Sequence, residues 1–83
     1  MRRRHVRTLE RMRAAPTPAD IRWSDIISLL SALGVEVRER AGSRVQLVKG
    51  SDSMVVHRPH PRPETRRDTV RDIVRFIERT GVS

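Results

Sequence analysis

The sequence contains no cysteine and no long hydrophobic run. Without cysteine it can form neither a disulfide nor a thiolate metal site, which is compatible with a reducing compartment. No apolar run approaches the ~18 residues that a membrane span needs, and the basic N-terminus lacks the apolar stretch of a signal peptide. We therefore expect a soluble, cytoplasmic protein with no membrane partner.

Acidic residues are also scarce: 18 lysines and arginines face 10 aspartates and glutamates, and the net charge is +8. The imbalance lies at the two ends, since residues 1–13 carry six arginines and one glutamate, residues 14–57 are neutral, and residues 58–83 carry seven arginines and four acids. A polyanion such as RNA or DNA is the natural partner for such a chain. The alternative is that 17 arginines against one lysine reflect the codon usage of a GC-rich genome.

The first 19 residues read as a basic helix followed by a proline-rich linker. A narrow apolar stripe of Val6, Leu9 and Met12 predicts a helix over residues 4–14, which prolines at positions 16 and 18 end. The stripe is too narrow to decide whether this helix docks on the domain or on a partner. His5, among the arginines, is expected to be solvated. Residues 20–83 then form the main domain, a small one that buries about 60% of its unfolded surface.

Two further helices have a wider apolar face. The first is expected to start at a cap on Ser24 or Asp25 and to end at Gly34. The second is expected to start with a capping box from Thr65 to Asp68 and to end at Gly81, with Val82 packing back on its last turn. An arginine row at steps of four should be solvated and paired with acids, for instance Asp68 with Arg71. The row consists of Arg67, Arg71, Arg75 and Arg79.

Three short strands lie between these helices. Alternating or continuous apolar residues predict strands over residues 35–38, 44–47 and 54–56, joined by turns around Gly42 and Gly50. Strands joined by tight turns form an antiparallel meander. The order predicts an α+β fold of the double-stranded-RNA-binding-domain kind (α-β-β-β-α) with an additional N-terminal helix. Two helices would cover one sheet face and leave the other wet.

The segment from His57 to Pro63 carries the chemistry. It holds two histidines, two arginines and three prolines, and it reads as a rigid, exposed connection. Imidazole can move protons near neutral pH, and guanidinium binds phosphate with two donors. In extended chain, His57 and His60 lie about 10 Å apart and point to opposite sides, so they are poor partners for one proton relay. They are also poor metal co-ligands, and we expect no metal and no other cofactor.

Several spaced motifs resemble those of the HicA toxins, small RNA-cleaving partners in type II toxin–antitoxin systems. The resemblance runs from Trp23 to Ser83. Its motifs are an amphipathic helix ending in glycine, a Gly-Ser-His motif at the start of the second strand, and an apolar run followed by proline and histidine. A Thr-Leu-Arg-x-Ile pattern follows nine residues after that histidine, and the pattern ends in a glycine with an aliphatic residue. Here they read Leu33-Gly34, Gly42-Ser43, Pro59-His60, Thr69-Val70-Arg71-Asp72-Ile73 and Gly81-Val82.

The resemblance implies metal-independent cleavage of mRNA and neutralisation by a HicB-like antitoxin. Arg44 stands where the family has its catalytic histidine after Gly-Ser, and arginine cannot act as a base because it stays protonated. If the protein cuts RNA, His57 or His60 must transfer the protons and Arg44 must serve as a clamp. The candidate RNA-binding residues are Gly42, Ser43, Arg44, Arg58, Arg62, Arg66 and Arg67.

Two other functions stay open at this point. Arg44 is consistent with a non-catalytic RNA-binding module on the same fold, and the separate N-terminal helix is consistent with a protein-interaction module that binds an acidic antitoxin. DNA binding is less favoured, because no helix-turn-helix spacing is present. All versions of the RNA hypothesis require Arg44 and His60 to lie on the same side of the molecule.

Overall fold

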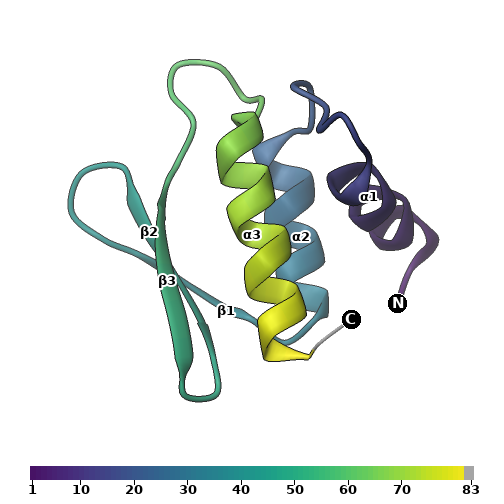
Figure 1. Ribbon diagram of the computed structural model, residues 1–83. Coiled ribbons are helices and arrows are strands. Elements are labelled where there is room, and N and C mark those ends of the chain that lie inside the picture. The colour runs from purple at the N-terminus through teal and green to yellow at the C-terminus, as the bar shows by residue number, and fades with distance from the viewer. Residues whose placement is uncertain (82–83) are drawn as a thin grey trace.

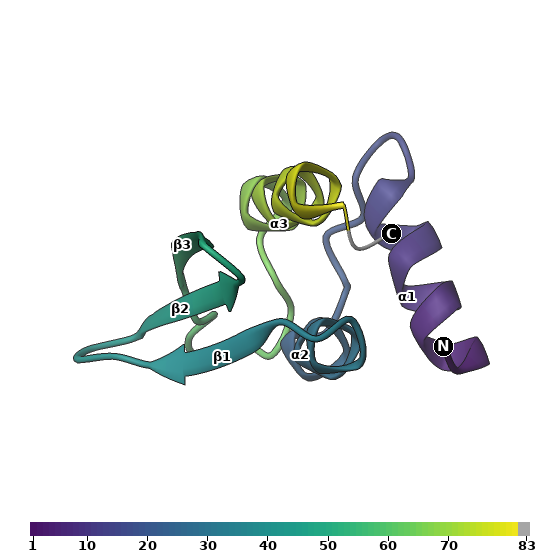
Figure 2. The same cartoon turned by 90° about the horizontal axis from the view of Figure 1, so that it is seen from below.

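Three layers stack in the computed structural model, which describes residues 1–81 (Figures 1 and 2). A three-stranded sheet forms one outer layer, two helices side by side form the middle, and the N-terminal helix forms the other outer layer. The elements are α1 (Arg3–Arg13), α2 (Trp23–Ala32), β1 (Glu36–Glu39), β2 (Arg44–Lys49), β3 (Asp52–His57) and α3 (Arg67–Thr80). The predicted α+β order is confirmed, and the strands lie within a few residues of their predicted bounds.

The sheet is the predicted antiparallel meander, with the order β1-β2-β3. Its register sorts the side chains by face, because successive residues of a strand point to opposite sides. Val45 lies opposite Val56 and is fully buried, so this pair faces the helices. Arg44 lies opposite His57 on the other face, which no helix covers. The wet sheet face expected from the sequence therefore carries an arginine–histidine pair.

The core lies between the sheet and the middle helices. Both helices bury apolar residues at helical spacing, which places one stripe of each against the sheet and against each other. The fully buried residues of these helices are Ile26, Leu29, Leu30, Val70, Ile73, Phe76 and Ile77. The expected glycines follow both helices: Gly34 lies just after the C-cap residue of α2, and Gly81 is the C-cap of α3. Both have the positive φ that side chains disfavour.

Neither predicted N-terminal cap forms. The caps are Arg22 for α2 and Arg66 for α3, and neither side chain makes a capping hydrogen bond. Thr65 is 1% exposed, and its hydroxyl has no hydrogen-bond partner. Its backbone N–H instead donates to the carbonyl of Ile21 at 2.8 Å. Thr65 is therefore held by a backbone hydrogen bond to a distant segment, and the predicted local capping box does not form. Val82, expected to pack on the last turn of α3, lies outside the described residues.

The N-terminal helix docks on α2 and α3, and its buried stripe differs from the predicted one. His5, Leu9 and Met12 are buried, whereas Val6 is 39% exposed. The i, i+4, i+7 spacing of the buried set fits the helical repeat better than steps of three. His5 was wrongly expected to be solvated: its Nε2 lies 2.8 Å from the hydroxyl of Ser28 on α2. Burial, with help from the nearby arginines, lowers the pKa of His5.

The arginine row of α3 is mostly engaged. Arg75 pairs with Asp72, and Arg79 pairs with Asp52 while its guanidinium lies 5.2 Å from the ring centre of Phe76. The predicted pair of Asp68 with Arg71 does not form, since Asp68 pairs with Arg66 at 3.3 Å. Within residues 1–81, no helix is both long and apolar enough to cross a membrane.

Candidate nucleic-acid interface

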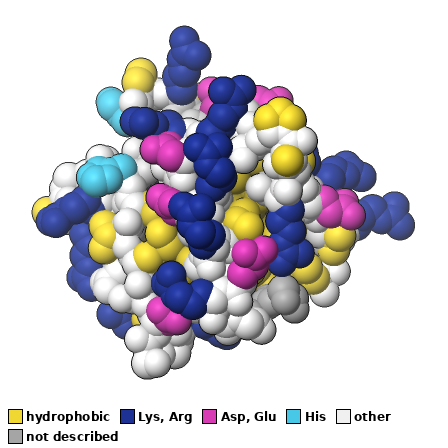
Figure 3. Space-filling model, in the orientation of Figure 1, with side chains coloured by type: hydrophobic (Ala, Val, Ile, Leu, Met, Phe, Trp, Pro, Cys, Tyr) yellow, Lys and Arg dark blue, Asp and Glu magenta, His cyan; other side chains and the backbone are white. Residues whose placement is uncertain are grey.

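A cleft of about 530 Å³ lies between β3, the connection to α3 and the first turns of α3. We call it the histidine cleft, because His57 and His60 both line it and both are exposed. Figure 3 shows exposed histidine side chains on this side of the molecule, with cationic and carboxylate side chains between them. The remaining lining comes from Val55, Val56, Arg58, Pro59, Pro61, Arg62, Glu64, Thr65, Arg66, Asp68, Thr69 and Asp72.

The connection that carries the histidines is held at both ends. At its start, the backbone N–H of Arg58 donates to the carbonyl of Ser43 at 2.7 Å, which extends the β2–β3 ladder by one pair. At its end, Trp23 N–H donates to the carbonyl of Pro63 at 2.9 Å, next to a bridge between Arg22 and Glu64. Prolines restrict φ between these anchors. The two imidazoles are therefore displayed on a constrained segment.

Arg44 stands beside His57 at the end of the sheet. The two residues are directly opposite in the register, so their side chains project from the same face with Cβ atoms about 4.5–5.5 Å apart. Arg44 does not line the histidine cleft, and its Nε donates to the carbonyl of Ala41 at 3.2 Å across the β1–β2 turn. His57 therefore lies opposite Arg44 in the sheet and also lines the histidine cleft.

Gly42 and Ser43 form the turn that leads into Arg44. Gly42 has a φ of +72°, which a glycine adopts without strain, and a Cβ there would meet nothing within 4 Å. The turn leaves backbone accessible next to the arginine–histidine pair. The carbonyl of Ser43 accepts the hydrogen bond from the backbone N–H of Arg58.

The other predicted RNA-binding arginines differ in their partners. Arg58 pairs with Glu39 and Arg66 pairs with Asp68, so carboxylates already neutralise them. Arg62 has no carboxylate partner among residues 1–81. Arg67 does not lie with the other predicted RNA-binding arginines. It lines no part of the histidine cleft, and its Nε donates to the carbonyl of Thr17 at 2.9 Å. The unpaired cations nearest the histidines are therefore Arg44 and Arg62.

The open sheet face adds a second set of charges beside Arg44. Arg38 makes two hydrogen bonds to Glu36, and this interaction lowers the pKa of the Glu36 carboxyl. Arg40 donates to the neutral amide of Gln46, so its charge stays uncompensated. Arg40 and Arg44 then flank the exposed side of the sheet near His57. Among residues 1–81, no three His, Asp or Glu side chains gather as a set of metal ligands.

Chemically, this arrangement combines two exposed imidazoles with guanidiniums that lack carboxylate partners. Imidazole can accept and donate a proton near neutral pH, and guanidinium can bind a phosphate and stabilise charge on it.

Reasoning from the sequence missed the acids Asp68 and Asp72 on the wall formed by α3. It also missed the bridge between Arg22 and Glu64, for which no local pattern is a signal, since the two residues are far apart in the chain.

A family model described as the HicA toxin of bacterial toxin–antitoxin systems matches residues 23–82. The match covers α2, the sheet and α3, and it leaves out α1 and the linker after it. Neither a search of curated proteins nor a search of solved structures found a match.

Proposed function

The chain belongs to the HicA toxin family, as a toxin of a toxin–antitoxin system, and we propose that it binds mRNA at the histidine cleft and cleaves it there. The observation that supports this most directly is the pairing of Arg44 with His57. The register places a permanent cation beside an exposed imidazole, and His57 and His60 line one cleft. Arg44 stays protonated, so it can bind a phosphate but cannot accept the proton that an imidazole accepts.

The proposed reaction is attack of the RNA 2′-hydroxyl on the adjacent phosphorus. One imidazole accepts the hydroxyl proton, and a protonated imidazole donates a proton to the departing 5′-oxygen. The products are a 2′,3′-cyclic phosphate on one fragment and a 5′-hydroxyl on the other. Arg44 would bind the non-bridging oxygens, where negative charge builds up. The reaction needs no metal, because these side chains supply the proton transfers and the positive charge.

The family also implies an antitoxin as partner. In this proposal the antitoxin is HicB-like and covers the open sheet face with acidic groups. Arg40 and Arg44 offer uncompensated charge there, and Val55 is 52% exposed on the same face. Binding at this position would block access to His57. Both the mRNA substrate and this inhibition place the protein in the cytoplasm.

The test is cleavage of a defined RNA by purified wild-type protein, by His57→Ala, His60→Ala and Arg44→Ala, and by the double variant His57→Ala/His60→Ala, with Arg13→Ala on α1 as the control. Loss of a general acid or base should lower the rate by about 10²–10⁴-fold. Loss of the charge clamp should lower it by about 10²–10³-fold. The control should keep the wild-type rate, and RNA with 2′-O-methyl groups should stay intact. Unchanged cleavage by the variant lacking both histidines would refute the assignment.

A second function rests on one specific residue. Arg44 stands at the position where the family has a histidine, which favours a toxin that binds RNA and blocks it without cutting. This version predicts salt-dependent RNA binding with no cleavage at high protein excess. The variant Arg44→His would then gain cleavage, because it places two imidazoles side by side at the end of the sheet. Wild-type cleavage above the background of the double histidine variant excludes this second function.

A further inference from the structure

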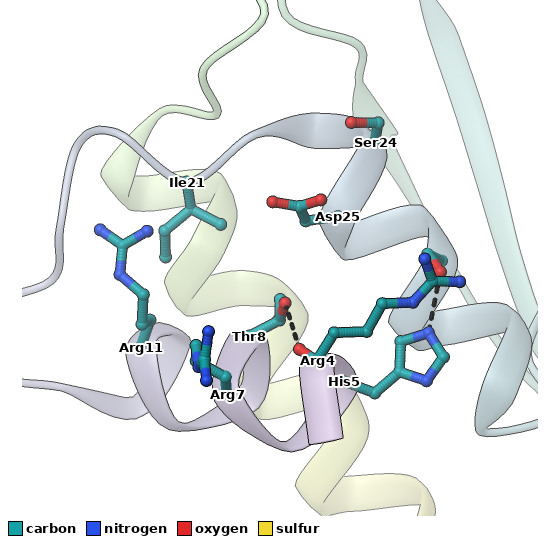
Figure 4. Close-up of a pocket in the computed structure, with 9 residues that line it drawn as sticks. Arg4, His5, Arg7, Thr8, Arg11, Ile21, Ser24 and Asp25 are labelled. Atoms are coloured by element: carbon teal, nitrogen blue, oxygen red, sulfur yellow. Dashed lines mark hydrogen bonds between the residues drawn. The ribbon is translucent and has the colours of Figure 1, made fainter. Parts of the chain in front are cut away.

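A groove of about 460 Å³ lies between α1 and α2, on the far side of the helices from the sheet (Figures 2 and 4). Arg4, Arg7 and Arg11 line it from α1, and Ser24 and Asp25 line it from the first turn of α2. Figure 4 shows the Arg4 side chain extending from α1 toward α2, while Arg7 and Arg11 project from α1 nearer to the linker. We call this feature the α1–α2 groove. The region that the family match covers contains only its α2 wall.

Two of its arginines are uncompensated. Arg11 pairs with Asp20 on the linker, whereas Arg4 and Arg7 have no carboxylate partner in the described chain. Asp25 is the one acid on the lining, so the groove keeps an excess of positive charge. The polar lining also includes hydroxyls of both helices, and Ile21 is the one aliphatic residue. A groove whose side chains are mostly polar and carry excess positive charge suits a polyanion.

A third hollow adjoins the histidine cleft and lies beside the α1–α2 groove, with which it shares no lining residue. It has a volume of about 540 Å³, and we call it the bridging hollow. Arg62 and Arg66 line both the bridging hollow and the histidine cleft. At the other end the hollow is lined by Asp20, whose carboxylate pairs with Arg11 of the α1–α2 groove. The three depressions thus follow one another across the surface, with arginine at each junction.

We propose that a single RNA strand bound in the histidine cleft continues through the bridging hollow and ends in the α1–α2 groove, where Arg4 and Arg7 bind its phosphates. The inference rests on the proposed function, since it extends the same strand beyond the cleft. Proteins that hold single strands without base specificity use positively charged grooves of this kind. Of the five acids that line the path, Asp20, Asp68 and Asp72 pair with arginines, whereas Asp25 and Glu64 form no ion pair among residues 1–81. The α1 helix then supplies a phosphate-binding wall to the family's common domain.

The experiment measures binding of 2′-O-methyl oligouridylates, which the protein cannot cleave, at two lengths and several salt concentrations. Lengths of about 4 and about 16 nucleotides span the usual site sizes of single-strand-binding folds. The test variant is Arg4→Gln/Arg7→Gln in the full chain. The control is Arg3→Gln/Arg13→Gln, which removes the same charge from the same helix at exposed positions outside the groove. Glutamine keeps helix propensity close to that of arginine.

We expect wild-type protein to bind the long oligomer more tightly than the short one. The test variant should lose this difference, and its slope of log affinity against log salt for the long oligomer should fall by about 1.4, or 0.7 for each lost phosphate contact. Its affinity for the short oligomer and both affinities of the control should stay at wild-type values. Equal losses in the test variant and the control, or an unchanged slope in the test variant, would overturn the inference while RNA binding at the cleft stands. Absence of binding at both lengths in wild-type protein would overturn the proposed function as well.

Discussion

Replacing Met12 by alanine tests whether α1 is part of the folded domain, which the α1–α2 groove requires. Met12 is 2% exposed, and it lies in the core with residues from α2, the sheet and α3. Truncation of a buried methionine to alanine costs about 2–5 kcal/mol, and a site at the edge of the core falls near the lower end because it can partly collapse. We therefore expect Met12→Ala to lower the free energy of unfolding by about 2 kcal/mol.

The assay is urea unfolding followed by the fluorescence of Trp23, the single tryptophan, which is half-buried at the start of α2. With a urea dependence near 1 kcal/mol per molar for a protein of this size, the midpoint should fall by about 2 M. Two controls separate packing from local effects. Met12→Leu keeps the volume and should cost less than about 1.5 kcal/mol, and Val6→Ala, on the exposed side of α1, should change stability by less than about 0.5 kcal/mol.

A midpoint for Met12→Ala that equals the midpoint of Val6→Ala would refute the reasoning, because the burial of α1 would then contribute nothing. A separate early transition confined to α1 would have a different meaning. It would show that residues 1–19 unfold before the rest of the chain. A single transition shifted by about 2 M places α1 in the same cooperative unit as the sheet and the other helices.

Three further substitutions test other features of the fold. Thr65→Val should keep or raise the urea midpoint, because it removes a buried hydroxyl without a hydrogen-bond partner. A decrease of about 1 kcal/mol in the free energy of unfolding would instead indicate that the Thr65 side chain caps α3. The contribution of neutral His5 to stability should be complete above pH 6.5 and should decline as the pH falls below that value, because burial lowers its folded-state pKa and the unfolded chain then binds the proton more readily. His5→Leu should remove this part of the pH dependence in urea midpoints at pH 7 and pH 5, and an unchanged dependence would contradict the assignment. Gly34→Ala should cost about 1–2 kcal/mol, because Gly34 has a φ of +81° and an added Cβ would lie 2.8 Å from the Lys49 amine; a thermal midpoint equal to wild type would contradict this.

The helices and strands themselves were predictable because their signals are local. Apolar spacing located α2 and α3, alternation located the strands, and the turn residues between strands indicated antiparallel pairing. The glycines at the ends of α2 and α3 were also identified correctly, since a positive φ is a property of the backbone at one position. The spaced motifs indicated the family, which the match over residues 23–82 shows.

Apart from the local pairing of Asp68, the errors concern contacts between segments far apart in the chain. Local spacing admits Val6 as well as His5 on the buried side of α1, and the choice depends on Ser28 of another helix. The predicted cap at Thr65 was wrong because the backbone of Thr65 bonds to Ile21. Arg67 was grouped with the cleft by its closeness in sequence, yet its side chain reaches the linker at Thr17.

The sequence by itself determined which residues can bind phosphate or move protons, because that capacity is a property of each side chain. It also determined the elements that carry them, because helical and strand spacing act over a few residues. Only the tertiary structure decided that Arg44 lies opposite His57 and that both histidines line one cleft. It alone also decided that α1 adds a second arginine-lined groove. The physical reason is that strand register and helix docking minimise the exposed apolar surface of the whole chain, and the polar groups are brought together as a consequence.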